Sequence, residues 1–162
     1  MGKTKTGFHK LNFDGSKLDS GVISIGFVIR NHCGEVISLD AKKNNFNSVI
    51  KAEAFALKAG LQEAIRLQIK KIEIEGDNLC VIRALQGLWS CPWDVEMIIS
   101  DSRLDLCYFD KIHIRHVFRE INCVADRLTH LGNSTPNTNF SEDPELRVLI
   151  RKDALGWTTS RR

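Results

Sequence analysis

Alternating apolar and polar positions open the chain. Leu11 and Phe13 alternate with polar neighbours over residues 9–13, and the run stops at Asp14-Gly15, a pair typical of turns. Residues 21–30 (GVISIGFVIR) are rich in β-branched side chains and lead into residues 31–34 (NHCG), which predict a hairpin turn before a third strand at residues 35–40. We therefore expect three consecutive antiparallel strands.

The hydrophobic period then becomes helical. Between Ser48 and about Leu67, Leu57 and Leu61 fall on the side of a 3.6-residue helix opposite Lys51 and Lys58. Further along, alternation predicts strands at residues 71–75 and 111–116, and helical spacing predicts helices at 78–88, 94–109 and 122–131. This order predicts an α/β fold, with a mixed sheet and helices covering its faces.

The last part of the chain differs in composition. Residues 132–143 (GNSTPNTNFSED) are polar and contain a proline, as linkers do, and residues 144–156 have helical spacing. The prediction is one domain at residues 1–131, followed by a linker and a short helical tail at 132–162.

Composition restricts the class of protein. The chain has 162 residues, 43% hydrophobic and 27% charged, which suits one ordinary core. Its net charge of +3 is too small to indicate a nucleic-acid partner. The five cysteines are scattered without a Cys-x-x-Cys pair, so reduced thiols are expected. Without a signal-like or membrane-spanning segment, we expect an intracellular protein, nuclear or cytoplasmic, with no membrane partner.

Glu53 is the first candidate for chemistry. It lies near the centre of the apolar face of its helix, about 160° from the charged stripe at ~100° per residue. Burying an unpaired carboxylate costs several kcal/mol, so such a residue meets a cation, a metal or hydrogen-bond donors. The ordinary alternative is a residue near the helix start that pairs with an arginine.

Three other acids have ordinary explanations when each is taken alone. Asp14 would belong to a turn, Asp77 would cap a helix, and Asp126 would complement a helix dipole. Together they indicate more, because ligands gather at the carboxyl ends of strands in α/β sheets. Four converging carboxylates suit Mg²⁺ or Mn²⁺, and two such ions can promote phosphodiester cleavage.

The segments LNFDGS, KAEAFAL, EIEGDN and HVFREINCVADRLTHLG occur in this order across about residues 8–131. In this set the chain resembles the type 1 ribonuclease H family, especially the short version found in plant retroelements. The tail EDPELRVLIRKDALG is similar to the C-terminal extension of those plant proteins. The resemblance implies the ribonuclease H-like fold, a five-stranded mixed sheet whose first three strands are antiparallel, with helices on both faces.

The resemblance also implies a function. Asp14, Glu53, Asp77 and Asp126 would bind two Mg²⁺ ions, with Mn²⁺ able to substitute, and His116, in a loop, would assist proton transfer or product release. The protein would be an endoribonuclease that hydrolyses the RNA strand of RNA/DNA hybrids. It would read the shape of the hybrid through 2′-hydroxyl and phosphate contacts. The resemblance also leads us to expect a monomer whose domain once belonged to a reverse transcriptase.

The chain departs from the family at two positions. Ile50 stands where many members carry an Asn that touches the hybrid, and Leu79 stands where a Gln often assists. Replacement polar contacts to the substrate are expected from Ser16, Ser20, Ser48, Asn78 and Asn122.

Two alternatives remain open. One is a catalytically weak or inactive module of the same fold that binds nucleic acid or protein. The other is a 3′-exonuclease, although such enzymes carry an Asp-x-Glu pair on the first strand, where this chain has Asp14-Gly15-Ser16.

Overall fold

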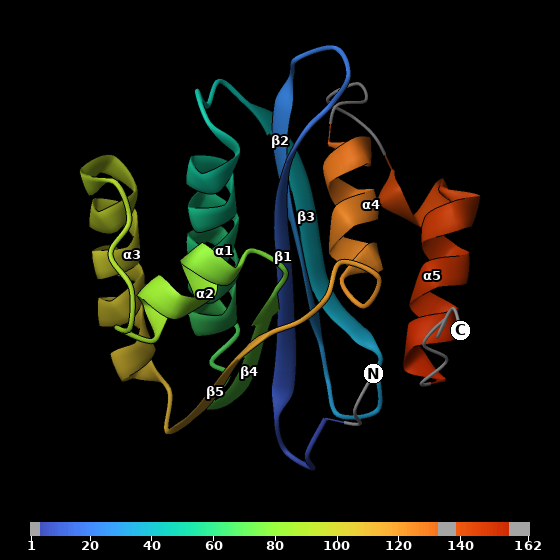
Figure 1. Ribbon diagram of the computed structural model, residues 1–162. Helices are drawn as coiled ribbons and strands as arrows, with labels where there is room; N and C mark the ends of the chain where they lie inside the picture. The colour runs from blue at the N-terminus through green and yellow to red at the C-terminus, as the bar shows by residue number, and fades with distance from the viewer. Residues whose placement is uncertain (1–3, 133–138, 156–162) are drawn as a thin grey trace.

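A mixed β-sheet forms the centre of the computed structural model, which describes residues 4–132 and 139–155 (Figure 1). Within these residues the sheet has five strands in the order β3-β2-β1-β4-β5. β1 and β2 are antiparallel, as are β2 and β3, whereas β4 and β5 run parallel to β1. The strands are β1 (His9–Lys17), β2 (Ile23–Arg30), β3 (Val36–Asn44), β4 (Lys71–Gly76) and β5 (Lys111–His116). The predicted mixed sheet with three antiparallel strands is confirmed.

Helices cover both faces of this sheet, as the sequence predicted. α1, α2 and α3 lie on one face, and α4 lies on the other with α5 packed against it (Figure 1). The helices are α1 (Val49–Arg66), α2 (Leu79–Leu85), α3 (Trp93–Asp105), α4 (Cys123–Leu131) and α5 (Pro144–Ala154), with short 3₁₀ turns at Leu106–Tyr108 and Phe140–Glu142. Among the described residues, no helix has the length and apolar character needed to cross a bilayer.

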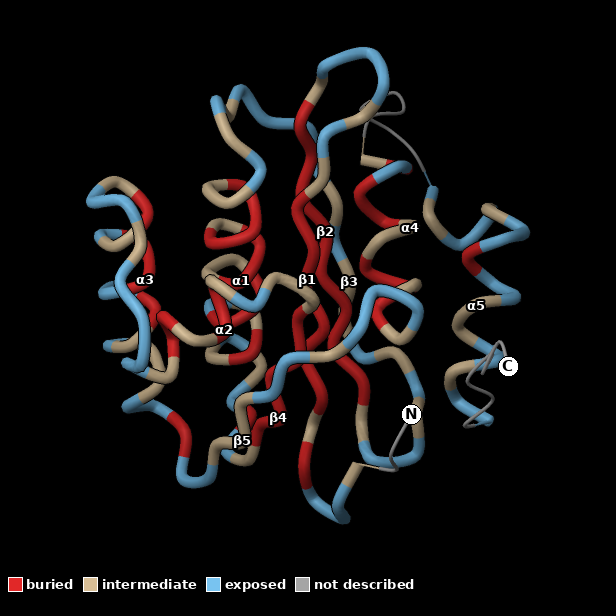
Figure 2. The backbone as a smooth tube through the Cα atoms, in the orientation of Figure 1, coloured by how far each residue is buried: buried red, intermediate tan, exposed pale blue. Residues whose placement is uncertain are grey.

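The main core lies between α1 and the sheet. Leu57 and Leu61, from the predicted apolar side of the helix, are fully buried and belong to one cluster with Leu11 and Phe13 of β1. Burial follows the strands and the inward sides of the helices (Figure 2). The 3.6-residue pattern therefore identified the correct packing face of α1.

A second, smaller core lies on the α4 face. Leu128 of α4 and Val28 of β2 pack there with Leu146 of α5, which is only 1% exposed. Arg127 of α4 reinforces the contact through an ion pair of 2.8 Å with Asp143. The helical tail thus packs on the sheet domain through α5. Residues 133–138 of the predicted linker, and Gly156, lie outside the described residues.

Two local predictions are wrong. β1 does not stop at Asp14-Gly15, because pairing with β2 continues through both residues and the strand ends at Lys17. The chain turns later, where Gly21 adopts a φ of +83° and the N–H of Leu18 donates to the carbonyl of Val22. His116 was expected in a loop, but it is the last residue of β5, paired with Gly76. In both cases, pairing with a neighbouring strand extends the regular structure.

Candidate metal centre

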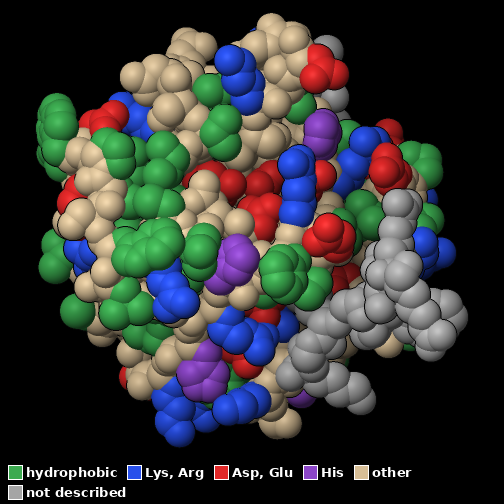
Figure 3. All heavy atoms as spheres, viewed as in Figure 1, with side chains coloured by type: hydrophobic (Ala, Val, Ile, Leu, Met, Phe, Trp, Pro, Cys, Tyr) green, Lys and Arg blue, Asp and Glu red, His purple; other side chains and the backbone are tan. Residues whose placement is uncertain are grey.

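Three carboxylates meet where β1, β4 and α1 come together. Asp14 lies within β1, Glu53 in the first half of α1, and Asp77 immediately after β4. Each offers an oxygen within 4.8 Å of an oxygen of the other two. Asp14 and Glu53 are each 4% exposed, and Asp77 is half-buried. These three residues are called the acidic cluster below. Asp and Glu side chains gather near the middle of the face seen in Figure 3, with Lys, Arg and His around them.

Gly15 allows α1 to come this close to β1. A Cβ atom at this position would lie 2.4 Å from the amide nitrogen of Glu53 and 2.6 Å from the carbonyl carbon of Ala52. No side chain fits at such distances, since core packing leaves no free space. The glycine of the Asp-Gly pair is therefore needed for a close backbone contact, and that contact brings Glu53 beside Asp14.

The cluster holds its protons more tightly than isolated acids do. Burial, followed by the charges of Asp77 and Asp126, raises the pKa of Asp14 to about 7. Burial and the neighbouring Asp14 raise the pKa of Glu53 well above its ordinary value, and burial also raises that of Asp77. In addition, Oε2 of Glu53 is buried and has no hydrogen-bond partner among the described residues. Clustered, desolvated oxygens of this kind fit a hard divalent cation.

Asp126 lies outside the set that Asp14, Glu53 and Asp77 form. It belongs to the first turn of α4, and its Oδ1 accepts a hydrogen bond of 2.8 Å from Arg119. Its charge contributes to the raised pKa of Asp14, while Arg119 acts in the opposite direction on the pKa of Asp14 and of Asp77. Of the four predicted ligands, the structure therefore brings three together and leaves the fourth in an ion pair. No pattern in the sequence had indicated Arg119.

His116 faces the acidic cluster from the end of β5. Its Nε2 lies 3.0 Å from the carbonyl oxygen of Asp77, and its ring meets Phe118 edge-on with centroids 5.9 Å apart. The side chain is exposed and therefore accessible from solvent.

Two of the expected substrate contacts are helix caps. Ser48 accepts a hydrogen bond of 3.3 Å from the amide of Lys51 at the start of α1. Asn78 accepts one of 3.1 Å from the amide of Val81 at the start of α2. Capping uses the side-chain oxygen of each residue as a hydrogen-bond acceptor. The NH₂ group of Asn78 and the hydroxyl proton of Ser48 can still donate to a substrate.

The two expected serine contacts near β1 differ in exposure. Ser20 is exposed in the turn after β1. Ser16 is half-buried, and its hydroxyl lies 2.6 Å from that of Thr129 in α4. Thr129 is fully buried and donates a hydrogen bond of 3.3 Å to Oδ2 of Asp14. Sequence reasoning did not identify Thr129, because on a helical period it belongs with the ordinary core positions of α4.

Asn122 is placed differently from the expectation. It is 1% exposed, and its side-chain amide donates a hydrogen bond of 2.8 Å to the carbonyl of Phe13. Its Oδ1 accepts one of 3.2 Å from Asn12. Both ends of the amide are engaged inside the protein, where Asn122 joins α4 to β1, and its contact with a substrate stays a prediction.

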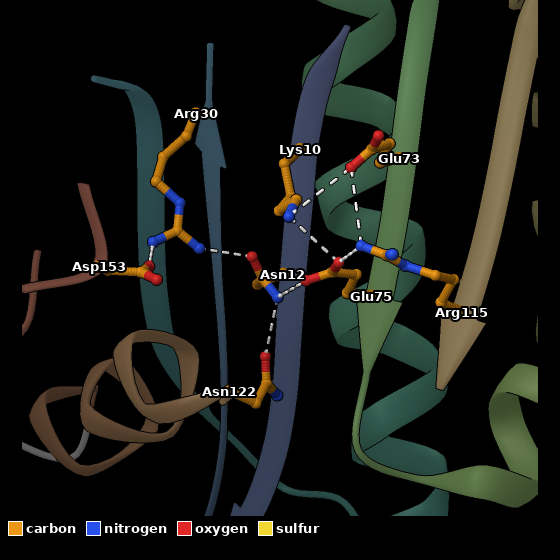
Figure 4. Close-up of polar contacts among 8 residues, drawn as sticks. All are labelled: Lys10, Asn12, Arg30, Glu73, Glu75, Arg115, Asn122 and Asp153. Carbon is orange, nitrogen blue, oxygen red and sulfur yellow. Dashed lines mark hydrogen bonds and ion pairs between the residues drawn. The ribbon is translucent and has the colours of Figure 1, made fainter. Parts of the chain in front are cut away.

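A second group of charges joins β1, β4 and β5, and three of its four residues are buried (Figure 4). The Nζ of Lys10 is 3.2 Å from Glu75 and 3.6 Å from Glu73, and Arg115 contacts both acids. Burial alone would raise the pKa of Glu75, but Lys10 and Arg115 together lower it. These four residues are called the neutralised network.

The strand order, the helices on both faces and the acidic cluster define a ribonuclease H-like domain. A sequence model of the family described as reverse transcriptase-like matches residues 12–132. The chain belongs to this family, and its domain is of the type 1 ribonuclease H kind. The resemblance to the type 1 ribonuclease H family and the fold expected from it are thereby confirmed. No curated protein sequence matches the chain.

Solved structures of ribonucleases H are similar to the chain. The RNase H1 of the halophilic archaeon Halobacterium salinarum is 28% identical, with a TM-score of 0.72, over 77% of this chain and 96% of that one. LC11-RNase H1 in complex with an RNA/DNA hybrid is 19% identical, with a TM-score of 0.68, over 75% and 94%. A foamy viral protease-reverse transcriptase in complex with an RNA/DNA hybrid shares the fold at 14% identity and a TM-score of 0.62, over 78% of this chain and 20% of that one.

Proposed function

We propose that the protein is a metal-dependent endoribonuclease that hydrolyses the RNA strand of RNA/DNA hybrids with two divalent ions. The observation that carries this proposal is the acidic cluster, in which three carboxylates offer oxygens within 4.8 Å of one another and one buried oxygen of Glu53 has no hydrogen-bond partner in the described part of the chain. A buried cluster of like charges is unfavourable unless a cation completes it. The hybrids bound to two of the similar structures support the choice of substrate.

Asp14, Glu53 and Asp77 would hold the cations, with Asp126 as the fourth ligand once Arg119 releases it. Mg²⁺ is the proposed ion and Mn²⁺ its substitute, since both prefer carboxylate and water oxygens. When bound, such ions lower the pKa of a water molecule and stabilise the leaving oxygen of a phosphodiester.

The other residues of the site would act on the substrate. His116, exposed beside Asp77, would transfer a proton or assist product release. Ser16, Ser20, Ser48 and Asn78 would contact 2′-hydroxyl groups, which distinguish RNA from DNA, or phosphates, which position the hybrid on the protein. A monomer, a nuclear or cytoplasmic location and an origin within a plant reverse transcriptase are further parts of this proposal.

A binding module of the same fold is the second candidate, and two residues favour it. Leu79 is 38% exposed at the start of α2, and Ile50 packs against the core, so neither offers a polar group to a hybrid. Weaker substrate binding follows, but the acidic cluster has no evident use in such a module.

Cleavage of an end-labelled RNA/DNA hybrid in Mg²⁺ and in Mn²⁺ tests the proposal. The wild type should produce internal cuts in the RNA strand and leave double-stranded RNA and DNA intact, and Asp77→Asn should abolish the cuts. Asp101→Asn is a matched control, because it removes an exposed acid that pairs with Lys58 and is not a member of the cluster. A folded wild type that binds the hybrid without cutting it in either metal would establish the binding module instead.

A further inference from the structure

Arg30, the last residue of β2, joins α5 to the middle of the sheet. It is 3% exposed, and its guanidinium forms an ion pair with Asp153 of α5, whose side chain is 9% exposed. The other end of the guanidinium donates a hydrogen bond to Oδ1 of Asn12 in β1 (Figure 4). Two elements far apart in the sequence are thus connected through one buried cation.

This contact fixes the orientation of the Asn12 amide. Because Arg30 can only donate, it selects the oxygen of Asn12 and turns the NH₂ group the other way. The NH₂ group then donates to Oε2 of Glu75 and to Oδ1 of Asn122, each at 3.2 Å. Without Arg30, Oδ1 of Asn12 has no guanidinium donor to hold it in this orientation. The amide of Asn12 could then rotate, and its hydrogen bond to Asn122 would weaken.

Asn122 carries the connection to the acidic cluster. Its NH₂ group donates to the carbonyl of Phe13, the residue before Asp14, at 2.8 Å. Its own backbone carbonyl accepts the amide of Asp126 at 3.0 Å, in the first turn of α4. Asn122 therefore joins the start of α4 to β1, and its two bonds lie next to Asp14 and Asp126, two of the proposed metal ligands.

We propose that Asp153 is a positioning residue for the metal centre, acting through Arg30, Asn12 and Asn122. This inference rests on the metal site proposed above. Asp153 lies in α5, beyond residues 12–132 that the family shares, so the C-terminal helix becomes part of the working site. Residues that orient metal ligands without touching the metal typically change metal affinity or activity about 10–100-fold when they are removed.

The first experiment compares Asp153→Ala with Glu145→Gln in the full chain. Glu145→Gln removes another ion pair between α5 and α4, 3.0 Å from Arg127, and leaves the contacts of Arg30 intact. Asp153→Ala should weaken Mn²⁺ binding, measured by titration calorimetry without substrate, about tenfold. It should also accelerate hydrogen exchange at the side-chain amides of Asn12 and Asn122, measured by NMR. Glu145→Gln should change neither. Equal Mn²⁺ affinities in the two variants would overturn the inference.

A double variant separates positioning from stability. Arg30→Met with Asp153→Leu replaces the buried ion pair by apolar side chains, an exchange that often preserves stability. It should fold like the wild type and yet bind Mn²⁺ about tenfold more weakly, because Asn12 has lost its donor. Wild-type affinity in this variant would reduce Asp153 to a structural role and overturn the inference. If the variants weaken Mn²⁺ binding but the wild type cuts no hybrid, the proposed nuclease fails while the positioning role stands.

Discussion

The acidic cluster and the neutralised network both contain buried carboxylates, but the pKa values of these carboxylates shift in opposite directions. Glu75 is fully buried, yet its pKa is lowered, because Lys10 and Arg115 contact it. Glu53 is 4% exposed, and its pKa is raised well above its ordinary value, because it is buried and its charged neighbours are acids. Both carboxylates are buried, so the difference between their partners decides the direction in which the pKa shifts. The network contains its cations within the chain, whereas the cluster is suited to take them from solution.

Of the changes considered, Asp14→Asn should have the largest effect, because it removes one carboxylate of the acidic cluster and leaves the neutralised network unchanged. Loss of a metal ligand removes several kcal/mol of transition-state stabilisation, so hybrid cleavage should fall at least about a thousandfold. The metal-free protein should become more stable at about pH 8, because a buried charge beside Asp77 and Glu53 disappears. Cleavage rates and urea unfolding in EDTA measure both effects, and a loss of stability in EDTA would contradict the second.

Glu75→Gln should have the opposite effect on stability. It removes the carboxylate closest to Lys10, which is 2% exposed, and should cost about 3 kcal/mol of unfolding free energy. Glu53→Gln, the same exchange in the acidic cluster, should cost nothing in metal-free buffer. Urea unfolding of the two variants measures the difference. Equal losses of unfolding free energy would show that the charge of Glu75 is no better balanced by its neighbours than the charge of Glu53.

The pH dependence of stability should also separate the two groups. The folded state raises the pKa of Asp14 from 3.8 to about 7, so it binds the proton more tightly than the unfolded chain does. This contribution is complete below pH 3.8 and is lost as the pH rises through 7, by about 2 kcal/mol between pH 5 and 7. Glu75 has a lowered pKa and acts in the opposite direction. Its contribution to the stability of the protein is present above the ordinary pKa of a glutamate and is lost as the pH falls below that pKa.

Thermal unfolding in EDTA across this range, with Asp14→Asn as the reference, measures the slope. The wild type should lose stability relative to the variant as the pH rises from about 5 to about 7. A constant difference between them would contradict the raised pKa of Asp14.

Mg²⁺ should produce the smallest effect. At about ten times its dissociation constant it should add about 1.4 kcal/mol of stability at about pH 7.5, seen as a higher melting temperature. Asp77→Asn should lose most of this gain. Asp94→Asn, which changes a partly exposed partner of Lys51, should keep it. An equal gain in both variants would mean that the ion binds elsewhere.

Local patterns were sufficient to predict much of the fold and one key feature of the site. Helix and strand periods predicted the order of the elements, and the apolar face around Glu53 indicated a buried acid. The end of β1 was predicted wrongly because Asp14-Gly15 has the composition of a turn. Only its pairing with Gly26 and Ile25 of β2 keeps it in the strand.

The neutralised network could not be predicted, because it depends on strand register. In the sequence, Lys10, Glu73 and Glu75 look like the solvated sides of alternating strands. Parallel pairing places Lys10 directly beside Glu73, and this pairing is not visible in either segment alone. The same holds for Asp126, whose pairing with Arg119 depends on how the loop before α4 folds.

The contact at Gly15 also has a consequence for ionic radius. Because the backbones of β1 and α1 touch there, the main-chain separation between Asp14 and Glu53 is fixed, and only rotation of the two side chains can change the distance between their carboxylates. Mg²⁺ binds oxygen at about 2.0–2.1 Å, and Ca²⁺ at about 2.3–2.6 Å with more ligands. A fixed main-chain separation limits how far the two carboxylates can move apart, so the missing side chain of Gly15 should favour the smaller ion over the larger one.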